Sequence, residues 1–115
     1  MVKILLTVDP RAYRETIGMA LDRLRPEVEV IIEEPDNLEA ALRSFEPEIV
    51  VCSEVTELVR QNTLAWIELY PEDEPHAIVR SVYGISTVND LDFDMLIEVV
   101  DETARIIERS KTTER

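Results

Sequence analysis

Three polar side chains stand directly after two apolar runs of the sequence. Asp9 ends the first run, and Ser53 with Glu54 follows a later one. In parallel α/β sheets, ligands bind outside the carboxyl ends of the strands, so residues at these positions are the first candidates for a binding site. Two carboxylates and a hydroxyl could hold a cation or a small polar ligand there. An alternative is open for Asp9, because an Asp before Pro10 is also an ordinary helix N-cap.

The single cysteine and the single histidine offer less chemistry. Cys52 lies inside an apolar run, which favours a buried and unreactive thiol. His76 lies in an acidic segment, which favours a solvated turn over a metal site or a general base. Its acidic neighbours are Glu72, Asp73 and Glu74. No glycine-rich phosphate loop, serine–histidine–aspartate arrangement or cysteine–histidine metal spacing is present, so we expect no catalytic residue, no metal site, no cofactor and no enzyme activity.

Charge disfavours several classes of partner. The chain carries 25 acidic and 12 basic side chains, a formal net charge of −13 at pH 7. Nucleic acids and anionic membranes bind basic patches, so neither is an expected partner. No apolar run approaches the roughly 20 residues that span a bilayer, and the first run is too short for a signal-peptide core. One cysteine cannot form an internal disulfide, so we expect a cytoplasmic protein.

The elements that must position these residues alternate between strand and helix in the first half. Strands are predicted at residues 2–8, 28–32 and 49–52, where apolar residues are nearly continuous, as in strands buried on both faces. Helical spacing of apolar residues separates them, over residues 10–25 and 38–45. A β-α-β-α-β order implies right-handed crossovers and a parallel sheet.

The second half departs from this alternation. Strands are predicted at residues 64–69 and 77–83, but the segment between them is shorter than the roughly twelve residues that a crossover needs. We therefore expect an antiparallel hairpin. A final helix follows, with Asp90 or Asp92 as its cap.

Two stretches resemble the start of a response-regulator receiver domain. Residues 4–15, ILLTVDPRAYRE, are similar to the family's first strand and acidic turn, and residues 38–53 to its second helix and third strand. The similarity covers residues 3–54. It implies a three-layer α/β/α sandwich around a mostly parallel five-stranded sheet of order 2-1-3-4-5, here with an antiparallel edge hairpin formed by strands 4 and 5. We expect one such domain over residues 1–110 and a frayed tail at 111–115.

The family's phosphorylation chemistry is missing from this sequence. Receivers hold Mg²⁺ with two acids after strand one and an aspartate after strand three, and that aspartate takes the phosphoryl group. Here Val8 stands in place of the first acid, Asp9 in place of the second and Ser53 in place of the phosphoacceptor. The family's lysine at the end of strand five has no counterpart, since the only lysines are Lys3 and Lys111. The resemblance therefore implies a non-catalytic regulatory module that acts through protein contacts.

Aromatic residues near the predicted hairpin are the candidates for such a contact. Trp66, Tyr70 and Tyr83 are expected to form one aromatic cluster. Core packing explains such a cluster, and so does a protein interface, where large aromatic side chains are enriched. The interface could join two copies of the chain as a homodimer or hold another protein partner. The alternative function is a small-ligand-binding domain, with its pocket at the carboxyl ends of strands 1 and 3 beside the polar residues described first.

Overall fold

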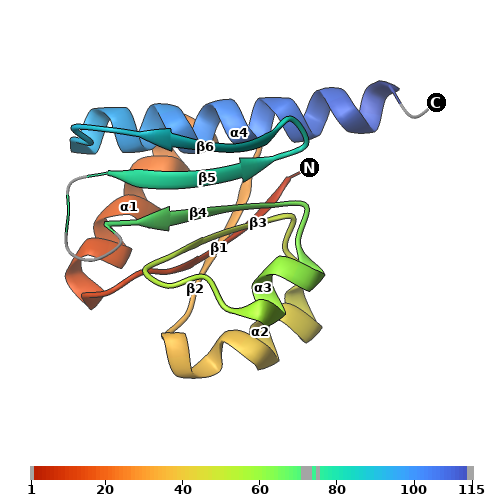
Figure 1. Cartoon of the computed structure of the whole chain (residues 1–115). Helices are drawn as coiled ribbons and strands as arrows, with labels where there is room; N and C mark the ends of the chain where they lie inside the picture. Colours follow the sequence, from red (N-terminus) through yellow and green to blue (C-terminus); the bar gives the residue numbers. More distant parts are fainter. Residues whose placement is uncertain (1, 71–73, 75, 114–115) are drawn as a thin grey trace.

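The structure is a computed structural model that describes residues 2–70, 74 and 76–113. Within these residues, six strands form one mixed sheet (Figure 1). The strands are β1 (Lys3–Thr7), β2 (Glu29–Ile32), β3 (Ile49–Cys52), β4 (Ala65–Leu69), β5 (Ala77–Ser81) and β6 (Gly84–Val88). The helices are α1 (Arg11–Leu24), the short 3₁₀ turn η1 (Pro35–Asn37), α2 (Leu38–Phe45), α3 (Glu57–Asn62) and α4 (Phe93–Thr113).

The sheet runs in the order β2-β1-β3-β4-β5-β6. β1 pairs in parallel with β2 and with β3, and β3 pairs in parallel with β4. The connections between these strands pass through α1, α2 and α3, as parallel neighbours require. β5 then returns antiparallel to β4. The predicted order of the first five strands and the predicted antiparallel hairpin are both confirmed.

The prediction of five strands was wrong, because a sixth follows a tight turn. β5 ends at Ser81, and Val82 and Tyr83 turn the chain into β6. That strand begins at Gly84, whose φ of 116° is a conformation that residues with a Cβ rarely adopt. The β4–β5 hairpin therefore lies inside the sheet, and β6 forms the edge. With three parallel and two antiparallel neighbouring pairs, the sheet is mixed.

The buried side chains form two clusters, and each contains residues from its own set of helices. Successive residues of a strand point to opposite faces. In β1, Ile4 and Leu6 are buried with side chains of α1 and α4, whereas Leu5 is buried with side chains of α2 and α3. This double burial explains why the sequences of β1 and β3 are almost continuously apolar. The first cluster also contains Ile17, Leu21, Leu96 and Val100, and the second contains Leu42, Val50, Val59 and Trp66.

The last helix begins with a side-chain cap. Asp92 Oδ1 accepts a hydrogen bond from the Met95 N–H at 2.8 Å, which confirms one of the two predicted caps. α4 continues to Thr113, past the expected domain end at residue 110. Residues 114–115 of the predicted tail lie outside the described residues. None of the helices in the described ranges combines the length and the apolar character that a membrane crossing requires.

The packing of α1 on the sheet requires a glycine. A Cβ at Gly18 would lie 2.5 Å from Ile32 Cδ1 and 3.2 Å from Ile32 Cγ1. Glycine in a helix interior is less favourable than alanine by about 1 kcal/mol. The chain accepts this cost because the helix can then lie close against the end of β2.

We expect Gly18→Ala not to stabilise the protein by that amount, because the new methyl group must displace Ile32. In an Ile32→Val background, which lacks Cδ1, the same substitution should be more favourable by roughly 0.5–1 kcal/mol. Urea denaturation of both single variants and the double variant measures this coupling. Strictly additive effects on the free energy of unfolding would contradict the close approach.

Candidate functional site

The carboxyl ends of β1 and β3 meet at one edge of the sheet, as predicted. The backbone N–H of Asp9 donates a hydrogen bond to Ser53 Oγ at 2.9 Å. Glu54 is exposed next to Ser53, and its charge is among the causes that raise the pKa of Cys52. No hydrogen bond among the described residues joins Glu54 to Asp9 or Ser53. The structure therefore brings two of the three predicted ligand-binding residues into direct contact.

Asp9 faces a buried arginine and does not cap the helix. Pro10 occupies the cap position of α1, where no side chain accepts a hydrogen bond from the helix, so the N-cap alternative is wrong. Arg14 Nη1 donates to Asp9 Oδ1 at 3.3 Å and to the Val8 carbonyl at 3.1 Å. The Arg14 side chain is 5% exposed and that of Asp9 is 65% exposed. Asp9 is thus the counter-ion of a cation that cannot shed its charge.

Sequence analysis missed Arg14, although a signal was present. Position 14 lies one turn before Ile17 and two turns before Leu21 on α1, and all three side chains are buried on the same face. Its position therefore predicts burial, whereas its residue type predicts exposure. The conflict between the two is a sign of a special site.

Arg14 also lines a cavity at the start of α1. The cavity has a volume of about 370 Å³ and lies between α1 and the loop that precedes α2. Arg14 Nε is buried and has no hydrogen-bond partner among the described residues. Ser53 and Glu54 do not line this cavity, so it lies on the β2 side of β1 and not between β1 and β3. Its lining includes both acidic and basic side chains. The lining residues are Asp9, Arg11, Arg14, Glu34, Pro35 and Asp36.

The three predicted interface aromatics do not form one cluster. Trp66 is 5% exposed and packs with side chains of α2 and α3. Tyr70 leaves the strand with φ of 51° and packs on the opposite core. Its Oη lies 2.5 Å from Tyr13 Oη, and burial, followed by this hydrogen bond, raises the pKa of Tyr13. Tyr83 sits in the β5–β6 turn and is 79% exposed. The expected cluster was wrong, because the three side chains go to three different environments.

The acidic loop before β5 falls partly outside the described residues. Glu72 and Asp73 are not described, whereas Glu74 and His76 are. His76 Nδ1 lies 3.9 Å from Glu74 Oε2, and the His76 carbonyl accepts a hydrogen bond from the Tyr70 N–H. In the described part of the chain, no group of three or more potential ligands could hold a metal ion.

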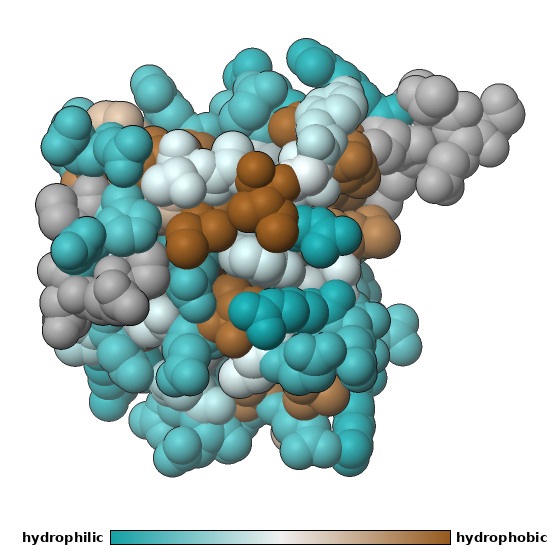
Figure 2. Space-filling model, viewed as in Figure 1, coloured by the Kyte–Doolittle hydropathy of each residue, from teal (hydrophilic) through white to brown (hydrophobic). Residues whose placement is uncertain are grey.

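A second candidate site is the exposed surface over β5 and β6. We call it the hairpin surface and define it by Leu64, Arg80, Val82, Tyr83 and Ile85. Its four uncharged side chains are between 51% and 79% exposed. Figure 2 shows hydrophobic residues gathered over this part of the sheet. A shallow depression of about 700 Å³ runs across the surface. None of its lining residues is acidic: Thr63, Leu64, Arg80, Ser81, Val82, Gly84 and Ile85.

The hairpin surface is open because α2 and α3 do not reach it. The register aligns Trp66 with Arg80 and Arg80 with Ile85, so these three residues share one face of the sheet. Trp66 is covered by α2 and α3, but Arg80 and Ile85 are exposed. Arg80 makes no hydrogen bond or ion pair with any residue that the structure describes. The face carries apolar side chains and one cation on a strongly acidic chain.

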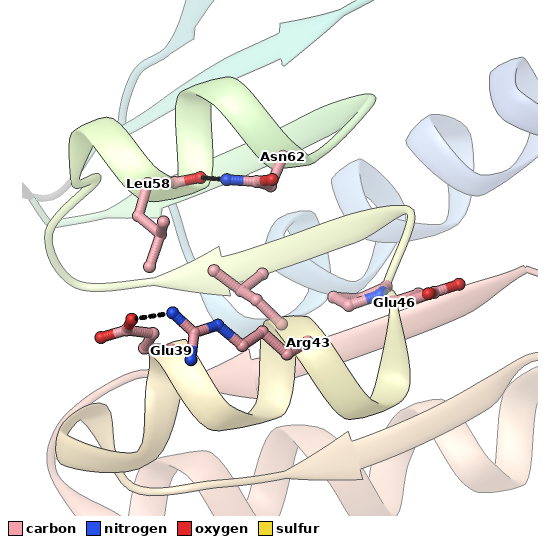
Figure 3. Close-up of a pocket in the computed structure, with 7 residues that line it drawn as sticks. Glu39, Arg43, Glu46, Leu58 and Asn62 are labelled. Atoms are coloured by element: carbon pink, nitrogen blue, oxygen red, sulfur yellow. Dashed lines mark hydrogen bonds and ion pairs between the residues drawn. The ribbon is translucent and has the colours of Figure 1, made fainter.

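The cavity between α2 and α3 offers less for recognition. It has a volume of about 560 Å³ (Figure 3). Arg43 Nη2 donates to Glu39 Oε1 at 2.5 Å, and Asn62 Nδ2 donates to the Leu58 carbonyl at 2.8 Å. The labelled polar groups on both helices are therefore partly engaged within their own helix, and none of them is buried.

Compared with protein-family models, curated proteins and solved structures, the chain matches none. The resemblance to receiver domains therefore rests on the residues of this chain alone. Two of the sites described above have chemistry that a function could use: the hairpin surface and the cavity at Arg14.

Cys52 is the last residue of β3, directly before Ser53, and it is buried. Its side chain is packed in the core, and desolvation, followed by the charge of Glu68, raises the pKa of the thiol to about 12. Its Sγ lies 3.9 Å from the Ile67 carbonyl oxygen. The thiolate is the reactive species, so this thiol is held in its unreactive form.

We expect the folded protein to react with a disulfide reagent such as DTNB far more slowly than the urea-unfolded chain at about pH 8, because the ordinary thiol pKa is about 8.5 and the folded one is higher. The chain has a single cysteine, so the released thiolate reports Cys52 alone. A folded-state rate close to the unfolded one would show that the thiol is neither buried nor protonated.

Proposed function

We propose that this chain is a non-catalytic, receiver-like regulatory module that acts by binding a protein chain at the hairpin surface. The observation that carries the proposal is an exposed apolar surface next to an edge strand, β6, whose outer side pairs with no strand among the described residues. Large exposed apolar patches mark interaction sites, and an open strand edge offers backbone donors and acceptors to a partner. The proposal includes the finer architecture of a receiver, in which α1 with α4, the sheet, and α2 with α3 are the three layers.

The polar edge of β1 and β3 supports a non-catalytic module. Ser53 is neutral, and its Oγ already accepts the Asp9 N–H. The Asp9 carboxylate already faces Arg14. Mg²⁺ is held by hard, negatively charged oxygen ligands, and an acyl phosphate needs a free carboxylate in place of Ser53. One carboxylate that is paired with an arginine is a poor substitute for the three acids of a receiver.

A variant with a photo-reactive amino acid in place of Tyr83 is produced in the native cells and irradiated. It should cross-link to a protein partner. The matched control is the same amino acid in place of Met19, which is 60% exposed on α1. We expect adducts of defined mass from position 83 and at most a background from position 19, detected by gel shift and mass spectrometry. Equal yields at both positions would remove the support for the hairpin surface.

Incubation with acetyl phosphate and Mg²⁺ tests the non-catalytic part of the proposal. We expect the intact mass of the protein to remain unchanged. A stable phosphate adduct would overturn this part, whatever the cross-linking experiment shows.

The cavity at Arg14 favours a second candidate function, the binding of a small ligand. A buried arginine with an unpartnered Nε is costly, and a ligand carboxylate is a fitting partner for a guanidinium. The carboxylates of Asp9, Glu34 and Asp36 line the same cavity and would attract a cationic group. A zwitterion such as a free amino acid carries both charges.

If this second function holds, one of the common free amino acids should raise the melting temperature in a concentration-dependent manner, as mass action requires. Arg14→Lys keeps a positive charge but loses the planar fork, so it should abolish the shift. Arg43→Lys, on the exposed face of α2, is the matched control and should leave the shift intact. No shift with any amino acid would reject this candidate.

A further inference from the structure

We propose that two copies of this chain pair their β6 strands antiparallel about a two-fold axis, which joins the two sheets into one. This inference rests on the proposed function and names its partner as a second copy. The contact is isologous, because the same strand serves on both sides.

The outer edge of β6 is open. Among the described residues, β6 pairs with β5 alone. In a strand, about half of the N–H and C=O groups point to each side, so those directed away from β5 have no strand partner. Four of its five residues are exposed and the fifth, Val88, is partly buried.

β6 also lacks the features that protect edge strands in other proteins. Such strands carry charged residues or proline, or a helix or loop covers them. The strand reads Gly-Ile-Ser-Thr-Val, with no charge and no proline. On a chain with a net charge of −13, an uncharged edge of this kind is a place where two copies can approach without direct repulsion.

Charge at the two ends of β6 favours an antiparallel pair of identical strands. Arg80 lies at the end where the strand begins, beside Ile85 in the register. Asp90 and Asp92 are exposed just beyond the end where the strand finishes. Antiparallel pairing brings the Arg80 end of one copy to the acidic end of the other, and does so twice. Parallel pairing would place like charges together, so the ends select the direction.

Pairing centred on Ser86 uses the whole strand. Ile85 then lies opposite the partner's Thr87, and Gly84 opposite the partner's Val88. Ile85 and Thr87 share the face of the hairpin surface, because side chains two apart on a strand point the same way. Ile85 of the hairpin surface and the partner copy's Ile85 then lie diagonally across the two-fold axis on one side of the joined sheet, each opposite a Thr87. A foreign extended peptide could fill the same edge, but it would not match both ends by symmetry.

Sedimentation velocity over a range of protein concentrations tests this inference. We expect a monomer–dimer equilibrium, weakened by roughly tenfold or more in Ile85→Lys, which puts a charge one residue from the axis on each copy. Met19→Lys adds the same charge on α1 and should leave the equilibrium nearly unchanged. Circular dichroism and urea denaturation establish that both variants fold.

Charge reversal tests the direction of pairing. Arg80→Asp and Asp90→Arg should each weaken the dimer, and the double variant should restore it. A cysteine in place of Ser86 should form a disulfide between two copies under mild oxidation, whereas one in place of exposed Asp22 should not, since Cys52 is buried in both.

A monomer at concentrations up to about 1 mM, the limit of weak association, would overturn the inference, as would a dimer that Ile85→Lys does not affect. If the chain is a monomer but position 83 still cross-links to a different protein, self-pairing is rejected and the proposed function stands. If the chain is a monomer and position 83 gives no more adducts than position 19, both are rejected.

Discussion

The shortness of the segment between β4 and β5 decides the second half of this fold. A parallel connection needs a crossover of roughly a dozen residues, so the chain returns antiparallel and then turns once more into β6. In the described part of the chain, no helix covers this half of the sheet on the side of α2 and α3. The last helix, α4, packs on the side of α1. On the opposite face Arg80, Ile85 and Thr87 are exposed, and among the described residues the outer edge of β6 pairs with no strand; together these features produce the hairpin surface.

In the first half of the chain, by contrast, polar groups at the carboxyl ends of the strands form hydrogen bonds and an ion pair with one another. Ser53 Oγ accepts the Asp9 N–H and joins the ends of β1 and β3. Arg14 is buried and cannot lose its proton, so it needs a nearby negative charge, which Asp9 supplies. The result is an edge that holds strands and helix together. Of the two carboxylates at this edge, that of Asp9 faces Arg14, whereas that of Glu54 is exposed.

Local patterns in the sequence determined most of the sheet. The continuous apolar runs of β1 and β3 require burial on both faces, which demands helices on both sides. Alternating strands and helices predicted the parallel pairing of the first half, the resemblance to receiver domains implied the order of the first five strands, and linker length predicted the reversal at β5. Because parallel strands finish at the same edge, the sequence also placed Asp9 beside Ser53, and it placed Cys52 in the core.

Contacts between distant segments decided the rest. β6 is exposed on both faces and so lacks the apolar alternation by which a strand is recognised; its pairing with β5 makes it a strand. Trp66 and Tyr70 would share a face in a regular strand, but the positive φ of Tyr70 turns it toward the other core. The burial of Arg14 depends on a carbonyl and a carboxylate at the end of β1. In each case the environment of a residue is set by its neighbours across the sheet, and spacing along the chain does not specify which neighbours those are.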